Sequence, residues 1–187
     1  MSHPDGLQFR RAAFSDASEI AALHADSWRR HYRGAYSDAF LDGDVGADRL
    51  AVWSERLRAP DSGRWTVLAE DESGLVGFAH TVFDDDATWG ALLDNLHVAY
   101  GVKRRGIGSR LLELTARAVT ERPASTGLYL WVLELNLEAQ AFYQAHGGTC
   151  VGRVDISPPG GIPGRLKGSP VALRYAWPDP AVLLGSG

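Results

Sequence analysis

One short turn combines residue types that could bind an anion. Residues 103–108 read K-R-R-G-I-G, so three basic side chains precede Gly106 and Gly108. Apolar alternation before the turn predicts a strand end, and apolar residues at helical spacing after it predict a helix. Such a turn directs free backbone N–H groups and the positive end of the helix dipole at one spot, which suits a phosphate or pyrophosphate. The plainer interpretation, close packing by the glycines beside a solvated basic loop, stays open on these residues alone.

A second unit, residues 128–148, carries a tyrosine on a short helix. It begins with the apolar run L-Y-L-W-V-L, which predicts a strand buried on both faces. Asn136 is a natural helix N-cap, and the helix after it carries Ala139, Phe142 and Tyr143 before two glycines end it. On these residues alone, the Phe–Tyr pair is most simply part of a core.

The elements around these units predict one α/β domain over residues 1–187. Strands are predicted at 7–12, 65–71, 75–83, 88–98, 128–135, 149–156 and 171–177, and helices at 16–33, 45–58, 106–122 and 137–146. Residues 157–169 contain too much Gly and Pro for regular structure and predict a long hairpin loop. This order predicts a mixed sheet with helices on both faces.

Composition excludes several classes of protein. The net charge of −4 argues against a general nucleic-acid binder, so the basic turn suits one small anion. Cys150 is the only cysteine, which excludes an intrachain disulfide and a cysteine-based zinc site, and no other metal site is expected. The N-terminus lacks the pattern of a signal peptide, and no apolar stretch is long enough to span a membrane. We therefore expect a cytoplasmic protein without a membrane or nucleic-acid partner.

The two units, in this order, resemble the GNAT superfamily of acyl-CoA-dependent N-acyltransferases. The family's pyrophosphate loop, Q/R-x-x-G-x-G/A, is similar to Lys103–Gly108, with the one departure that Lys103 stands at the Gln/Arg position. The family's second unit, N-x-x-A-x-x-F-Y, is matched from Asn136 to Tyr143. The resemblance covers residues 64–178 well and the N-terminal third more loosely.

The resemblance implies a GNAT-like domain with a mostly antiparallel sheet of about seven strands, splayed in the middle to admit the cofactor. The cofactor-binding core would span about residues 88–148. The implied activity is transfer of an acetyl group from acetyl-CoA to a primary amine of a small molecule or a peptide N-terminus, by direct attack through a tetrahedral intermediate. The alternative is a non-catalytic acyl-CoA-binding module or sensor. Family members often dimerise through terminal strands or first helices, so a homodimer is among the expected assemblies.

The resemblance also assigns roles to single residues. Tyr143 matches the general acid that protonates the leaving thiolate, and the backbone N–H of Val98 would stabilise the oxyanion. The residues expected to contact the cofactor are Leu96, His97, Val98, Lys103, Arg104, Arg105, Gly106, Ile107, Gly108, Ser109, Asn136, Ala139, Phe142 and Tyr143.

The general base is the point where the sequence departs from the family. Some members carry a glutamate at the position of Leu92. Asp94 shares a strand face with Leu92 and is the best substitute, whereas His97 is expected on the opposite face. Deprotonation by bulk water stays open.

Aromatic residues of the first helix, together with the acidic loop 84–86, give a signal about the acceptor. Trp28 and Tyr32 are four residues apart and share one side of the helix, and Tyr36 follows. They could be part of the core, or they could form an acceptor wall that favours a cationic or ring-bearing amine.

Overall fold

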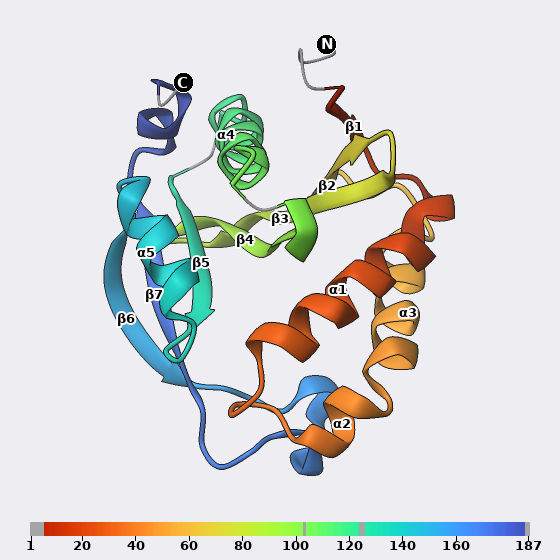
Figure 1. The fold of residues 1–187 in the computed structure, drawn as a ribbon. Coiled ribbons are helices and arrows are strands. Elements are labelled where there is room, and N and C mark those ends of the chain that lie inside the picture. Colours follow the sequence, from red (N-terminus) through yellow and green to blue (C-terminus); the bar gives the residue numbers. More distant parts are fainter. Residues whose placement is uncertain (1–5, 103, 124–125, 186–187) are drawn as a thin grey trace.

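A single seven-stranded sheet forms the centre of the computed structural model, which describes residues 6–102, 104–123 and 126–185 (Figure 1). The strand order is β1-β2-β3-β4-β5-β7-β6. Adjacent strands run antiparallel, apart from the parallel pair β4–β5. The strands are β1 (Gln8–Arg11), β2 (Arg64–Asp71), β3 (Gly74–Asp86), β4 (Gly90–Val98), β5 (Leu128–Leu133), β6 (Thr149–Asp155) and β7 (Val171–Trp177). The mixed, mostly antiparallel sheet predicted from the sequence is confirmed.

Helices cover both faces of this sheet, as predicted. In Figure 1, α1 (Ala17–His31) and α3 (Val45–Arg56) lie on one side of β2–β4, and α4 (Ile107–Thr120) lies on the other. The last helix, α5 (Leu137–Ala145), packs on β7, where Tyr143 contacts Tyr175 and Trp177. One short helix, α2 (Asp38–Asp42), was not predicted.

Two buried clusters attach the helices to the sheet. On one face, Ile107 and Leu111 of α4 pack against β2 and β3, where Gly77 allows the helix to come close. A Cβ at Gly77 would lie 3.1 Å from Cγ2 of Ile107. On the other face, Trp53 of α3 packs on Phe78 of β3. Both layers of the core therefore pack against β3, one on each of its faces.

The sheet opens between β4 and β5, as the resemblance implied. Within the described residues, the parallel pairing of these strands covers only Ala91–Leu128 and Leu92–Tyr129. Beyond that point β5 continues to pair with β7, while β4 keeps only its antiparallel partner β3. The edge of β4 over residues 93–98 therefore faces a gap in the sheet.

A β-bulge interrupts β4 at Asp94. Asn95 is opposite His80, and Leu93 is opposite Thr81, so Asp94 is an extra residue without a partner on β3. Because side chains alternate along a strand, one extra residue reverses which positions share a face.

The loop 157–169 returns to the turn between α1 and α2. Ser37 N donates to Arg165 O, and Lys167 N donates to Ala35 O, both at 2.9 Å. Arg165 also forms an ion pair with Asp48 of α3. The predicted hairpin loop is thus joined by backbone hydrogen bonds to the N-terminal helices. No helix in the described ranges has the length and apolar character needed to cross a membrane.

Candidate active site

A cavity of about 510 Å³ lies where α1, the open edge of β4, the start of α4 and the helix α5 meet. Most of the residues that the sequence assigned to cofactor binding line it: Leu96, His97, Val98, Arg104, Gly106, Ile107, Gly108, Ser109, Asn136, Ala139, Phe142 and Tyr143. Arg105 does not line it and instead forms an ion pair with Asp71 of β2. Lys103 lies outside the described residues. The structure therefore brings the two sequence units to one cavity.

The turn before α4 has a backbone suited to an anion. Arg104 and Gly106 both have positive φ, at 70° and 75°. For Arg104 this left-handed conformation costs about 1 kcal/mol, which is typical of strain held at a functional site. The first turn of α4 leaves the N–H groups of Ile107, Gly108 and Ser109 without intrahelical acceptors, and these residues line the cavity. The turn could hold a phosphate or pyrophosphate group.

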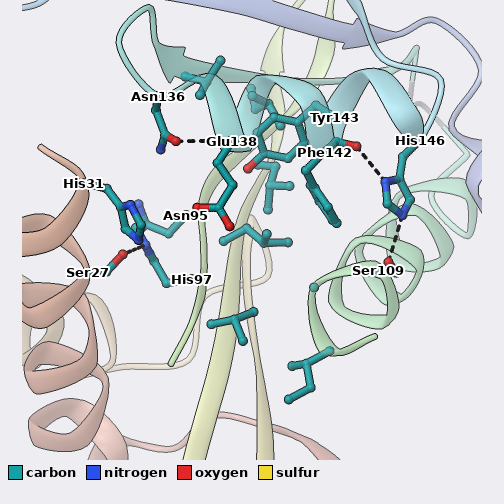
Figure 2. Close-up of a pocket in the computed structure, with 18 of the residues that line it drawn as sticks. Ser27, His31, Asn95, His97, Ser109, Asn136, Glu138, Phe142, Tyr143 and His146 are labelled. Atoms are coloured by element: carbon teal, nitrogen blue, oxygen red, sulfur yellow. Dashed lines mark hydrogen bonds between the residues drawn. The ribbon is translucent and has the colours of Figure 1, made fainter. Parts of the chain in front are cut away.

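His146 joins the start of α4 to the end of α5 (Figure 2). Its Nδ1 lies 2.8 Å from the carbonyl oxygen of Phe142, and its Nε2 lies 2.9 Å from Oγ of Ser109. A carbonyl can only accept, so Nδ1 donates to Phe142, and Nε2 forms the hydrogen bond with the Ser109 hydroxyl. The sequence analysis missed this residue, although its spacing of four from Phe142 places both on one face of α5.

Tyr143 projects from α5 into the cavity, beside Phe142 (Figure 2). Its side chain is buried. This burial is the main cause that raises its pKa above the usual value, and the nearby Tyr32 adds to the rise. The phenol therefore stays protonated and can donate a proton. The predicted N-cap of its helix is present, since Ala139 N donates to Oδ1 of Asn136 at 3.2 Å.

The open edge of β4 presents backbone donors to the cavity. Ala99 N donates to Val76 O of β3 at 2.8 Å. Because N–H directions alternate along an antiparallel strand, the amide of Val98 points away from β3 and toward the gap. Val98 also lines the cavity, so its N–H could bind an oxygen there.

The expectation that Asp94 and His97 point to opposite faces is wrong. Arg56 of α3 contacts both Asp94 (Nη1–Oδ2 2.8 Å) and its neighbour Asn95 (Nη1–Oδ1 3.1 Å). His97 also points to this side, since its Nδ1 lies 2.7 Å from Oγ of Ser27 on α1. The bulge at Asp94 is the reason, because the extra residue puts Asp94, Asn95 and His97 on one face.

His97 packs against two other rings. Its ring is 4.6 Å from that of His24 and 5.3 Å from that of Phe78, between centroids. Burial, followed by the charge of His31, lowers the pKa of His97 to about 3. The ring is therefore neutral at neutral pH.

On the α1 side, one of the three predicted wall residues lines the cavity. Tyr32 lies on the wall, and burial, followed by Asp94, raises its pKa to about 12. Trp28 and Tyr36 instead belong to a buried cluster behind Tyr32, with the Trp28 and Tyr32 rings stacked 5.3 Å apart. The wall is completed by Ser27 and His31, which the sequence analysis did not assign to the site.

Glu138 is a further lining residue that the sequence did not single out. It occupies a variable position of the second motif, and Figure 2 shows its side chain extending from α5 toward the cavity. With Asp94, it gives the lining of the cavity two carboxylates. In the described ranges, no group of three or more His, Cys, Asp or Glu side chains is arranged to hold a metal ion.

Comparisons with known proteins agree with this geometry. The sequence model of the Acetyltransferase (GNAT) family matches residues 23–148. "Probable N-acetyltransferase Rv2775" of Mycobacterium tuberculosis is 32% identical over 143 residues, which cover 75% of this chain and 79% of that protein. "Uncharacterized N-acetyltransferase YuaI" of Bacillus subtilis is 27% identical over 177 residues, 93% of this chain and 94% of that one. The fold is similar to that of the PaiA N-acetyltransferase of Thermoplasma acidophilum, crystallised with coenzyme A, with a TM-score of 0.68, 18% identity and coverage of 91% and 99%.

Proposed function

Because the chain belongs to the acetyltransferase (GNAT) family, we propose that it transfers the acetyl group of acetyl-CoA to a primary amine of a small molecule or a peptide N-terminus. One observation carries the proposal. A single cavity joins the turn before α4, the open edge of β4 and the buried phenol of Tyr143. These supply an anion cradle, an oxygen-binding amide and an acid, which acyl transfer from a thioester to an amine requires.

The residues present fit acetyl-CoA. The strained turn and the free N–H groups of Ile107, Gly108 and Ser109 would hold its pyrophosphate, and Arg104 would add positive charge. When bound, acetyl-CoA supplies the thioester carbonyl that the amine attacks. A relative of the same fold was crystallised with coenzyme A in its structure, which supports this choice of donor.

Two groups of the chain would act on the thioester, one on its carbonyl oxygen and one on its sulfur. The amide of Val98 would donate a hydrogen bond to the carbonyl oxygen as negative charge develops on it. Tyr143, kept protonated by its buried position, would give its proton to the departing sulfur. Burial strengthens both interactions because little water competes inside the cavity.

Asp94 would receive the proton of the incoming ammonium, directly or through a water. Its carboxylate forms an ion pair with Arg56, which holds it beside the cavity. Asp94 and Glu138 would together attract a cationic amine, and Tyr32 would provide an aromatic surface beside it. We therefore expect acceptors that are positively charged in solution.

The first test is thermal unfolding with and without excess acetyl-CoA, followed by a turnover screen over an amine panel. A ligand at about 100 times its dissociation constant stabilises the native state by about 2.7 kcal/mol, a shift of a few degrees. We expect such a shift, and release of free thiol with at least one amine. Absence of any shift at millimolar acetyl-CoA would refute the proposal. A shift without turnover on any amine would instead favour an acyl-CoA-binding module.

A further inference from the structure

A second cavity, of about 400 Å³, lies apart from the first, at the C-terminal end of α3. Its walls come from residues 11–14, at and after the end of β1, and from the connection between α3 and β2. Four arginines line it, against one acidic residue, Asp61: Arg11, Arg56, Arg58 and Arg64. The charged residues of this cavity are mostly basic, whereas the lining of the first cavity carries the carboxylates of Asp94 and Glu138.

The positive charge of the walls is only partly compensated, since the pair that Arg58 forms with Glu55 is about 70% exposed. Arg11 has no ion-pair partner in the part of the chain that the structure describes. Arg64 pairs with Asp61 at 3.4 Å, where both side chains are about half exposed (48%), and such a contact is weak. Guanidinium groups bind carboxylate and phosphate in a planar, bidentate manner, so this arrangement suits an oxyanion.

Two buried polar side chains line the same cavity. Thr66 and His80 are paired across β2 and β3, and Oγ1 of Thr66 lies 2.7 Å from Nδ1 of His80. His80 is only 2% exposed, and its Nε2 has no hydrogen-bond partner among the described residues. Buried polar atoms are normally satisfied, and one left over beside a cavity points to a ligand.

We propose that this second cavity is a binding site for a small anion that carries a carboxylate or phosphate group. The arginines would hold the charged group, and Nε2 of His80 would bind one of its atoms. Ala12, Phe14 and Leu57 also line the cavity and would cover an apolar part of the ligand.

Arg56 connects the two cavities. It lines the second, while its Nη1 lies 2.8 Å from Oδ2 of Asp94, which lines the first. An anion bound at Arg56 competes with Asp94 for the same guanidinium. Occupancy of the second cavity therefore changes the position and charge environment of Asp94. This consequence rests on the proposed function, whereas the binding site does not.

Binding is tested by thermal unfolding in sodium phosphate and in sodium succinate, each against sodium chloride at equal ionic strength. Saturating acetyl-CoA is present so that the turn before α4 is filled. We expect a saturable rise in midpoint with at least one anion. The Arg11→Gln/Arg64→Gln double variant should raise the dissociation constant of that anion at least tenfold. The control double variant, Arg117→Gln/Arg153→Gln, changes two exposed arginines on α4 and β6 and should leave it within twofold.

Two results would overturn the site: no saturable rise with either anion, or the same dissociation constant in both double variants. The readout needs no turnover, so the site can fail or succeed independently of acetyl transfer. If acetyl-CoA does not bind, the same titration without it still separates the two double variants. For the coupling, the anion should change kcat/KM for the amine at least threefold in the native protein and not in the Arg11/Arg64 variant. Equal responses would overturn the coupling.

Discussion

The side chains of Asp94 and His97 leave β4 on the same face of the sheet, although an odd number of positions separates them. The bulge at Asp94 causes this. It also turns the Asp94 carboxylate toward Arg56. This carboxylate and the neutral ring of His97 therefore both border the α1 side of the cavity. Both side chains therefore lie where they could take a proton from a bound amine.

Asp94→Asn should lower kcat/KM for the amine by about 10- to 100-fold, because the variant keeps the shape of the side chain and loses its ability to take a proton. The dissociation constant of acetyl-CoA should not change. Steady-state kinetics and a binding titration measure the two quantities. Asp84→Asn is the matched control, since Asp84 is exposed, has a positive φ that asparagine accepts, and lies outside the cavity.

His97→Gln separates the two residues that the bulge brings together. If Asp94 takes the proton, this variant should retain activity within about threefold of the native protein. A larger loss in His97→Gln than in Asp94→Asn would assign the base to His97 instead.

Tyr143→Phe should lower kcat at least tenfold without weakening acetyl-CoA binding, because only the proton donated to the leaving sulfur is lost. Tyr175→Phe is the control, since Tyr175 is a buried tyrosine that contacts the Tyr143 ring and donates nothing to the cavity. Single-turnover kinetics would show the effect on the chemical step. Full activity of Tyr143→Phe would remove the tyrosine from the mechanism.

Gly106→Ala should weaken acetyl-CoA binding at least fivefold. An alanine resists the positive φ of 75°, and the turn relaxes away from the geometry that directs its N–H groups at the anion. Gly74→Ala carries a comparable strain, at φ 108° at the start of β3. Both variants should lose about 1 kcal/mol of stability, but only the first should change the dissociation constant. Equal binding by both would show that the turn does not hold the ligand.

Stability should fall as the pH drops below about 6.5. His24 and His80 are almost fully buried, and burial lowers the pKa of His24 and brings that of His80 to about 4. The folded state thus binds fewer protons than the unfolded state, whose histidines titrate near 6.5. The stabilisation is complete above about pH 6.5 and is lost toward pH 4, at about 1.4 kcal/mol per histidine per pH unit.

Urea unfolding at about pH 7.5 and about pH 5.5 measures this dependence. His80→Gln, which can keep a hydrogen bond to Thr66, should reduce the difference between the two pH values by about 1.4 kcal/mol. A stability that does not change over this range would contradict the assignment of neutral buried histidines.

Much of the fold follows from local pattern. The apolar stripe of α4, the N-cap at Asn136 and the continuous apolar run of β5 each predicted an element at its observed place. Gly106 marked a turn whose positive φ the structure contains. These features depend on near neighbours in the chain, and near neighbours are what a sequence shows.

The parts that the sequence did not predict depend on distant contacts. The bulge at Asp94 is set by the pairing of β4 with β3, and no residue type in D-N-L-H predicts it. Arg56 meets Asp94 only because α3 lies over this bulge. The spacing of Trp28 and Tyr36 left open a core or a wall, and α2 and the loop 157–169, which cover them, place both in the core. Such relationships need three-dimensional neighbours.

The two-position pairing between β4 and β5 divides the sheet into a four-stranded ribbon and a three-stranded ribbon. A donor molecule lying in the gap would form hydrogen bonds with the edge of β4, in place of the backbone hydrogen bonds that β5 does not make there. Binding of the donor in the gap and the stability of the folded sheet are then thermodynamically linked. Amide hydrogen exchange near the gap, and the lifetime of the protein against proteolysis, should follow the local supply of acetyl-CoA.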